Sequence, residues 1–219
     1  MSRRPSPRRL PVAPALDAHR VELAACRRCD LAPEVLPIVS EARTPRVILV
    51  GQAPGKTEIE CRRPFAGRAG RTLFQWLARA GLDEQNARES IYIAAITRCY
   101  PGPSPSGRGD RVPSPGERER CAGWLATELR IIRPALLIPV GRLAIDRFFG
   151  AVPLDRIIGM PQQVEHEGGR STAVALPHPS GASSWVHQPG HRDLLDRALD
   201  HLARAMAELG ITSSTRSAA

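Results

Sequence analysis

The stretch RVILVGQAPGKTEIE, residues 46–60, opens with an apolar run rich in branched side chains and then turns at Gly51. An apolar run of this length, closed by a glycine turn, predicts a buried β-strand. Three more runs of the same kind follow along the chain, at residues 91–97, 135–141 and 171–177. Continuous apolar runs are typical of strands in a parallel sheet that is covered on both faces.

Helical patterns separate or follow these runs. Apolar residues recur at helical spacing in residues 71–81, 116–134 and 191–210, and a glycine or a proline stands at the end of each segment. The alternation of strand and helix predicts an α/β fold, a three-layer αβα sandwich around a mainly parallel sheet of four strands. Because ligands bind at the carboxyl ends of the strands in such sheets, we expect the functional residues in the loops there.

The chain of 219 residues and 23.8 kDa is long enough for one domain with a full core. Residues 1–15 are basic and rich in proline, and residues 211–219 are small and polar, so both are predicted to be disordered tails around a single domain at 16–210. No apolar run approaches the roughly 20 residues that cross a bilayer, and the amino terminus lacks the apolar stretch of a secretory signal. We therefore expect a soluble, cytoplasmic protein that does not contact membranes.

The chain is strongly basic, with a formal net charge of +9, and Lys56 is its only lysine. A basic surface attracts polyanions, and the planar fork of arginine suits phosphate, so nucleic acid is the first partner to consider. Scattered, solvated arginines are the alternative interpretation of the charge alone.

The Gly-Lys-Thr at residues 55–57 resembles the end of a phosphate-binding loop, but the spacing excludes a nucleoside triphosphate site. Such a loop needs four residues between its first glycine and the Gly-Lys-Thr, whereas three separate Gly51 from Gly55, and one of them is Pro54, which has no amide hydrogen. A tight turn with free amides instead suits a small planar ligand. Phe65, which follows a proline and is flanked by glycines, would give that ligand an aromatic surface to stack on, or would be an ordinary core residue.

The segment LPHPSGASSW, residues 176–185, follows the last predicted strand. It places His178 between two prolines at the carboxyl edge of the sheet, where an imidazole can act on a ligand or serve only the structure. The small residues after it suit a loop that presses into a DNA groove; these are Ser180, Gly181 and Ser183.

A long loop rich in Pro, Gly and Ser joins the second predicted strand to the next helix, at residues 98–117. Loops of this length within a compact domain are usually functional or disordered. Arginines within it, among them Arg108 and Arg111, could contact phosphate. The chain also carries five cysteines, an odd number without an export signal, which favours metal ligation over structural disulfides.

Taken together, these motifs resemble the iron–sulfur uracil-DNA glycosylases of the family-4 type. The resemblance rests on GQAPG at 51–55, RPFAGRAG at 63–70 and HPS at 178–180, and it extends over about residues 20 to 208. It implies the α/β fold of that superfamily and a monofunctional DNA glycosylase of base excision repair, which hydrolyses the bond between uracil and deoxyribose and leaves an abasic site.

The resemblance also implies a 4Fe-4S cluster with four thiolate ligands. Family members carry a Cys-x-x-Cys pair, a third cysteine after the second strand and a fourth on the following helix, and this chain has cysteines in those places: Cys26, Cys29, Cys99 and Cys121. A four-cysteine zinc site is the chemical alternative, because zinc accepts the same ligands. Cys61 has no counterpart in the pattern.

Roles in the reaction carry over from the same motifs. Phe65 would stack on a uracil rotated out of the DNA helix, and His178 would donate a hydrogen bond to uracil O2 as the base leaves. The turn would bind the edge of the base through Gly51, Gln52, Ala53 and Gly55. DNA phosphates would be held by Arg68, Arg108 and Arg111.

Two residues depart from the family pattern. Gln52 stands where relatives have an acid that positions or activates water, so another carboxylate would have to serve, with Asp110 the first candidate and Glu58 the second. Ala95 stands where relatives have an asparagine that reads the polar edge of uracil, a task that the Gln52 amide could perform instead.

The expectation from sequence is thus an active uracil-DNA glycosylase with a variant site, monomeric because one chain can build the whole site. The alternatives are a protein that binds uracil or damaged DNA with little turnover, and a glycosylase that prefers another deaminated base.

Overall fold

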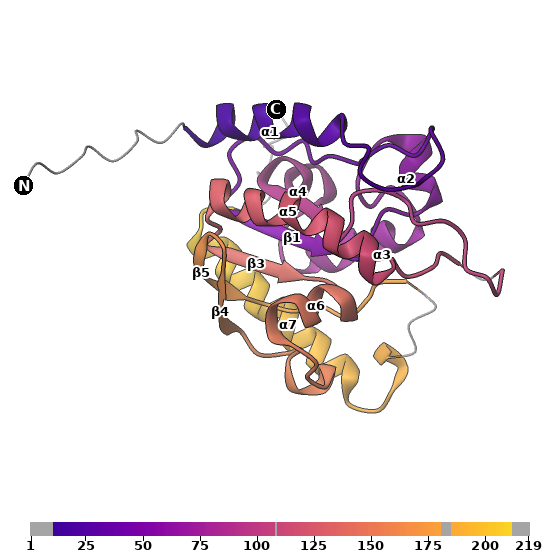
Figure 1. Ribbon diagram of the computed structural model, residues 1–219. Coiled ribbons are helices and arrows are strands. Elements are labelled where there is room, and N and C mark those ends of the chain that lie inside the picture. Colours follow the sequence, from indigo (N-terminus) through magenta and orange to yellow (C-terminus); the bar gives the residue numbers. More distant parts are fainter. Residues whose placement is uncertain (1–10, 108, 181–184, 212–219) are drawn as a thin grey trace, which may run out of the picture.

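The computed structural model describes residues 11–107, 109–180 and 185–211. Its centre is a sheet in the order β2-β1-β3-β5-β4, in which all neighbours are parallel except β4 and β5 (Figure 1). The strands are β1 (Val47–Gly51), β2 (Ile91–Ala95), β3 (Leu136–Pro139), β4 (Gln162–His166) and β5 (Gly169–Ala173). The mainly parallel sheet is as predicted, and it has one strand more than the four expected.

The additional strand, β4, escapes prediction because of its composition. It lies at the edge of the sheet, and of its five residues, QQVEH, only Val164 is buried. A single buried residue among polar ones gives no apolar run. The fourth predicted strand, 171–177, is also displaced: β5 ends at Ala173, and the chain then returns to the sheet through an isolated parallel bridge between Leu176 and Val140.

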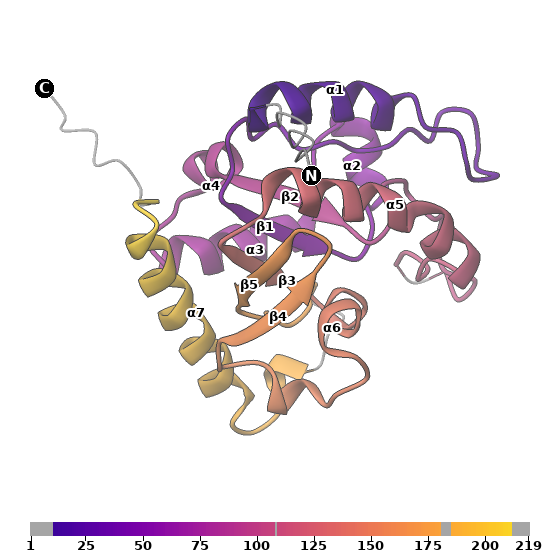
Figure 2. The same ribbon diagram turned by 60° about the vertical axis from the view of Figure 1, so that its left-hand side comes forward.

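Helices cover both faces of the sheet, as predicted for a three-layer sandwich. On one face, α1 (Val12–Ala24) and α5 (Pro115–Ile132) pack on alternate strand residues such as Ile48 and Tyr92. On the other face, α3 (Arg68–Arg79) and α7 (His191–Glu208) pack on the intervening residues, such as Leu49. Figures 1 and 2 show α1 and α5 on one side of the sheet and α7 on the other. The shorter elements are α2 (Lys56–Cys61), α4 (Glu84–Ser90), α6 (Arg142–Phe149), η1 (Leu154–Arg156) and η2 (Trp185–His187).

The three predicted helices are confirmed within a few residues. The start of α5 shows why: the Ser114 side chain accepts the Glu117 N–H while the Glu117 carboxylate accepts the Ser114 N–H, a reciprocal cap that fixes the first turn. The helix ends at Ile132, just before Arg133 in the left-handed region and Pro134.

Both predicted domain boundaries shift outward. Helix α1 begins at Val12, inside the segment 1–15 that was expected to be a disordered tail, and its Leu16 is fully buried. At the other end, Ile211 packs against the core, although the tail was expected to begin there. No helix among the described residues has the length and apolarity needed to cross a membrane.

The parallel strands bring three loops together at their carboxyl ends. The N–H groups of Ile96 and Thr97, just after β2, donate to the carbonyls of Gly51, the last residue of β1, and of Gln52, the residue that follows it. On the other side of β1, the Gly141 N–H donates to the Leu176 carbonyl and so draws the segment with His178 to the same edge. This edge carries the candidate site.

Candidate active site

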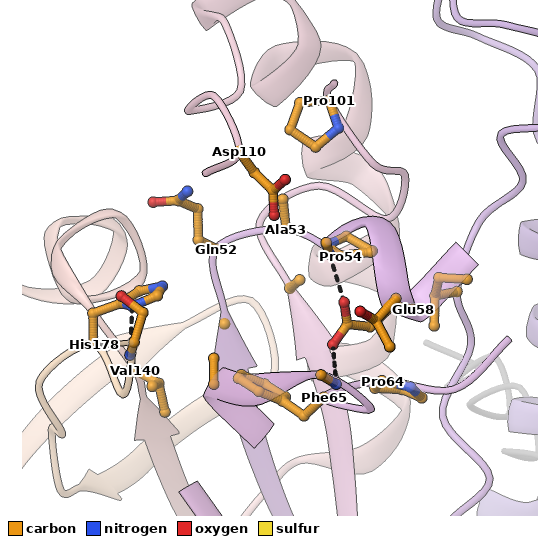
Figure 3. Close-up of a pocket in the computed structure, with 18 of the residues that line it drawn as sticks. Gln52, Ala53, Pro54, Glu58, Pro64, Phe65, Pro101, Asp110, Val140 and His178 are labelled. Atoms are coloured by element: carbon orange, nitrogen blue, oxygen red, sulfur yellow. Dashed lines mark hydrogen bonds between the residues drawn. The ribbon is translucent and has the colours of Figure 1, made fainter. Parts of the chain in front are cut away.

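A cavity of about 670 Å³ opens at the carboxyl edge of the sheet, beside β1 and β2 (Figure 3). It brings together most of the residues that the sequence singles out, although these residues are spread over more than half of the chain. Those that line it are Gly51, Gln52, Ala53, Gly55, Phe65, Arg68, Ala95, Asp110, Arg111, His178 and Ser180. Arg108, Gly181 and Ser183 lie outside the described residues.

Phe65 forms one wall of the cavity and rests directly on Gly51. A Cβ at Gly51 would lie 2.9 Å from the Phe65 Cζ, so only glycine admits the ring there. Phe65 itself has a φ of +50°, in the left-handed region that side chains rarely adopt. Its carbonyl would lie 1.8 Å from a Cβ at Gly70, so the second glycine of the motif is required as well. The motif thus fixes an aromatic face beside the end of β1.

Glu58 ties the two turns of the site together. Its carboxylate is buried and accepts N–H groups from both, Gly55 at 2.9 Å and Gly67 at 3.0 Å (Figure 3). Both oxygens are thereby engaged by backbone, which favours a structural role for this residue over the activation of water. Glu58, the second candidate for activating water, is therefore less favoured than Asp110.

Arg88, which the sequence does not single out, supports the Phe65 turn from behind. Its guanidinium donates to the carbonyls of Pro64 at 2.7 Å and Phe65 at 3.1 Å, and lies 4.3 Å from the centre of the Phe74 ring. Burial, which outweighs the ion pair with Glu84, lowers the pKa of Arg88 from its ordinary value. A polar residue in a short helix such as EQNARES gives no sequence signal for this contact.

His178 faces Phe65 across the cavity and is held in one orientation. The Ser180 N–H donates to His178 Nδ1 at 3.2 Å, and the Ser180 hydroxyl lies 2.9 Å from the same nitrogen. Burial lowers the pKa of His178 from its ordinary value, which favours the neutral imidazole. Because Nδ1 accepts, the neutral ring carries its proton on Nε2 and can donate it to a ligand.

Asp110 reaches the cavity because the long loop is folded back on itself. Pro103 and Asp110 form an isolated antiparallel bridge, and the Ser104 N–H donates to the Gly109 carbonyl. Figure 3 shows the Asp110 carboxylate pointing into the cavity above Ala53, opposite Phe65. A Cβ at Gly55 would lie 2.9 Å from its Oδ2. Desolvation by burial, together with the nearby Asp110 carboxylate, raises the pKa of the Tyr100 phenol.

Arg111 lines the cavity but is already engaged. Its guanidinium donates twice to the Glu117 carboxylate, at 2.7 and 2.6 Å, and this pairing is the main reason why the pKa of Glu117 falls to about 2. The pair fastens the long loop to the start of α5, so the expected contact of Arg111 with phosphate competes with a strong bond within the chain. Arg68, by contrast, is exposed at the first residue of α3.

The two residues that depart from the family pattern meet in the cavity. Ala95 ends β2 and pairs in register with Gly51, and it offers only a methyl group to the wall. Gln52, the next residue after β1, also lines the cavity and carries an amide with a donor and an acceptor.

The four cysteines of the pattern surround a second, smaller pocket between α1, α5 and the start of the long loop. Cys121 is buried and the other three are half-buried. Burial, together with the negative charges of the other three thiolates, raises the pKa of the Cys99 thiol to about 12. Within the described ranges, no three or more His, Cys, Asp or Glu side chains form a group that could hold a metal ion. Cys61 is exposed at the end of α2 and does not line this pocket.

A buried polar network, which has no local signal in the sequence, backs this pocket. Glu128 on α5 is fully buried, pairs with Arg98, and accepts hydrogen bonds from Tyr92 at 2.8 Å and His19 at 3.2 Å. Burial, reinforced by the Glu128 charge, raises the pKa of Tyr92 well above its ordinary value. The network joins α1, β2 and α5 beside Cys99.

Comparisons with known proteins agree on one family. Residues 38–209 match the model described as the uracil DNA glycosylase superfamily. A type-4 uracil-DNA glycosylase of Archaeoglobus fulgidus is 33% identical over 167 residues, which make up 73% of this chain and 78% of the relative. One of Thermotoga maritima is 31% identical over 62% of this chain and 65% of the relative. One of Saccharolobus solfataricus is 28% identical over 90% of this chain and 89% of the relative.

Proposed function

This chain belongs to the uracil-DNA glycosylase superfamily, and we propose that its cavity removes uracil from DNA by hydrolysing the N-glycosidic bond, which leaves an abasic site with intact phosphodiesters. The observation that carries the proposal is the meeting of Phe65, His178 and Asp110 around one cavity. These residues supply a stacking surface, a neutral hydrogen-bond donor and a carboxylate. One chain provides all three, so we propose a monomer that acts inside the cell on uracil-containing DNA.

The base reaches the cavity by rotating out of the DNA stack, because its glycosidic bond is inaccessible within the duplex. Phe65 stacks on the uracil ring, and the turn after β1 meets its edge through Gln52 and Ala53, because the Gly55 N–H is already bonded to Glu58. Arg68, exposed at the cavity rim, binds a flanking phosphate. The engaged Arg111 contributes less to DNA binding than Arg68, since its guanidinium is already paired with Glu117.

The leaving base is stabilised by His178. Negative charge develops on uracil O2 as the bond breaks, and the Nε2–H of a neutral imidazole donates a hydrogen bond to it. Ser180 fixes the ring so that this proton points into the cavity. A donor that is placed in advance is worth roughly 10²–10³ in rate, because it needs no rearrangement when the charge appears.

The attacking water is activated by Asp110. Gln52 can orient a water but cannot take its proton, and the Glu58 oxygens are occupied by backbone N–H groups. Asp110 is the remaining carboxylate among the described residues that line the cavity, and the Tyr100 phenol lies near it. It therefore serves as the general base that the family pattern places elsewhere.

The four cysteines suit the 4Fe-4S cluster of the family resemblance. Thiolate ligation is what such a cluster requires, and all four cysteines line one pocket. Cys26 and Cys29 precede the first strand, whereas Cys99 follows β2 and Cys121 lies on α5. When bound, the cluster supplies cross-links that fasten these three segments to one another.

Gln52 reads the polar edge of uracil. It takes over the task of an asparagine in the family pattern, where this chain has Ala95. For Gln52→Ala we expect a loss of discrimination between uracil and cytosine, because a side-chain donor and acceptor pair is removed from the cavity. Excision rates on matched uracil and cytosine oligonucleotides measure the effect. If the variant retains both turnover and discrimination, Gln52 does not read the base.

The proposed reaction is tested with labelled oligonucleotides that contain one uracil, hypoxanthine or cytosine. After treatment with the protein and then alkali, a strand is cleaved only where the base was removed. We expect cleavage at uracil. Cleavage only at hypoxanthine would indicate a glycosylase for another deaminated base, and tight binding without cleavage would indicate a protein that recognises uracil without turnover.

A further inference from the structure

Unpartnered polar atoms gather around the cysteine pocket. Among the described residues, five buried side-chain nitrogen or oxygen atoms lack a hydrogen-bond partner. They are Arg20 Nε, Thr97 Oγ1, Arg98 Nε, Arg118 Nε and Trp124 Nε1. Three of these residues line the pocket that the four cysteines surround. Buried donors are almost always satisfied in folded proteins, and a bound ion or cofactor is one known reason for exceptions. Their concentration at one pocket points to a group that supplies acceptors there.

Trp124 is the most constrained of the three. It lies on α5 one turn after Cys121, and its side chain is packed from two sides. The His19 ring meets it edge to face at 5.3 Å, and the Arg28 guanidinium, between Cys26 and Cys29 in the chain, lies 4.7 Å from its centre. The indole Nε1 is buried and has no hydrogen-bond partner among the described residues. Because an indole N–H only donates, it needs an acceptor within the pocket.

Thr97 lines the pocket from a different element. It lies two residues before Cys99, and its backbone N–H is already bonded to the Gln52 carbonyl at 3.2 Å, which fixes its position. Its hydroxyl is buried without a hydrogen-bond partner within the described ranges, and the residue lines the same pocket. Two residues with unpartnered donors thus line the cysteine pocket, Trp124 from α5 and Thr97 from the segment after β2.

We propose that Trp124 Nε1 and Thr97 Oγ1 donate hydrogen bonds to sulfur atoms of the iron–sulfur group that the four cysteines hold. The inference rests on the cluster of the proposed function. Both the thiolates and the inorganic sulfides of such a group carry negative charge and accept hydrogen bonds, whereas a zinc ion adds no acceptor beyond the thiolates. Hydrogen bonds to these sulfurs stabilise the reduced form, which carries the greater negative charge, and so raise the reduction potential.

The test compares two conservative tryptophan variants of the full chain. Trp124→Phe removes the N–H but keeps an aromatic ring between Arg28 and His19. Trp76→Phe is the matched control, because Trp76 is also 8% exposed and lies on a helix, α3, but does not line the cysteine pocket. Thr97→Val removes the second donor with almost no change of shape and remains informative if Trp124→Phe does not fold.

We expect Trp124→Phe and Thr97→Val to shift the cluster's reduction potential to more negative values. We also expect them to accelerate the loss of visible absorbance to a chelator by roughly 2- to 10-fold, the range that one net hydrogen bond represents in an equilibrium. Trp76→Phe should match the wild type in both measurements.

The failures of the two proposals are distinguishable. Iron analysis of the wild-type protein comes first, and a colourless protein that contains zinc and no iron would overturn the cluster and this inference together. The other outcome is that the wild type contains iron but Trp124→Phe and Thr97→Val both keep its reduction potential and its rate of absorbance loss. That outcome would overturn the proposed hydrogen bonds and leave the cluster in place.

Discussion

Asp110→Asn should slow uracil excision by about 10²–10⁴, the usual contribution of a general base. Asparagine keeps the shape of the side chain, but it cannot take a proton from water. Single-turnover kinetics with a uracil oligonucleotide measure the chemical step separately from DNA binding, which we expect to change little.

Tyr100→Phe is the control for Asp110. It leaves the carboxylate intact and removes only the phenolic hydroxyl beside it, so we expect a smaller loss than for Asp110→Asn. Should Asp110→Asn retain the wild-type rate, the water would require no base from this loop, and stabilisation of the leaving uracil would account for most of the catalysis.

His178→Ala should reduce the single-turnover rate by roughly 10²–10³, or about 3–4 kcal/mol, because it removes the donor to the developing charge on uracil. Ser180→Ala should have a smaller effect, since the Ser180 backbone N–H still donates to Nδ1 and only the hydroxyl contact is lost. A rate for His178→Ala within a few-fold of the wild type would remove this residue from the mechanism.

The same histidine gives the pH dependence a definite sign. Burial lowers the pKa of His178 in the folded protein below its ordinary value of about 6.5, so the unfolded chain binds more protons than the folded chain below that pH. Its contribution to stability is therefore complete above about pH 6.5 and declines as the pH falls through the lowered value. The excision rate should be insensitive to His178 titration at neutral pH, where the ring is already neutral.

The positions of the main strands and helices could be predicted because each has a strong local pattern. The four apolar runs correspond to strands or strand-adjacent segments, and their parallel arrangement brings Gly51, Ala95 and His178 to one edge. Strand β4 has a single buried residue, so its pairing with β5 depends on a turn and on tertiary contacts rather than on periodicity. Tertiary packing also orders residues 12–15, where composition alone indicated a tail.

The partners of charged residues could not be predicted from the sequence. Arg111 was expected to meet phosphate, but it lies six residues before Glu117 and folds onto the cap of α5. Arg88 and Glu128 each make contacts with residues more than twenty positions away, and only the fold brings them together. A charged side chain carries no local signal that separates a solvated residue from one that positions an active site.

The most direct test of the central claim, that this cavity hydrolyses the bond to uracil, is the mass of both products under single-turnover conditions. An oligonucleotide with one uracil is incubated with excess wild-type protein, and mass spectrometry then determines the masses of the strand and of any released base. We expect free uracil in an amount equal to the substrate and a strand with the mass of the abasic product. An intact oligonucleotide that stays bound to the protein, with no free uracil, would contradict the account.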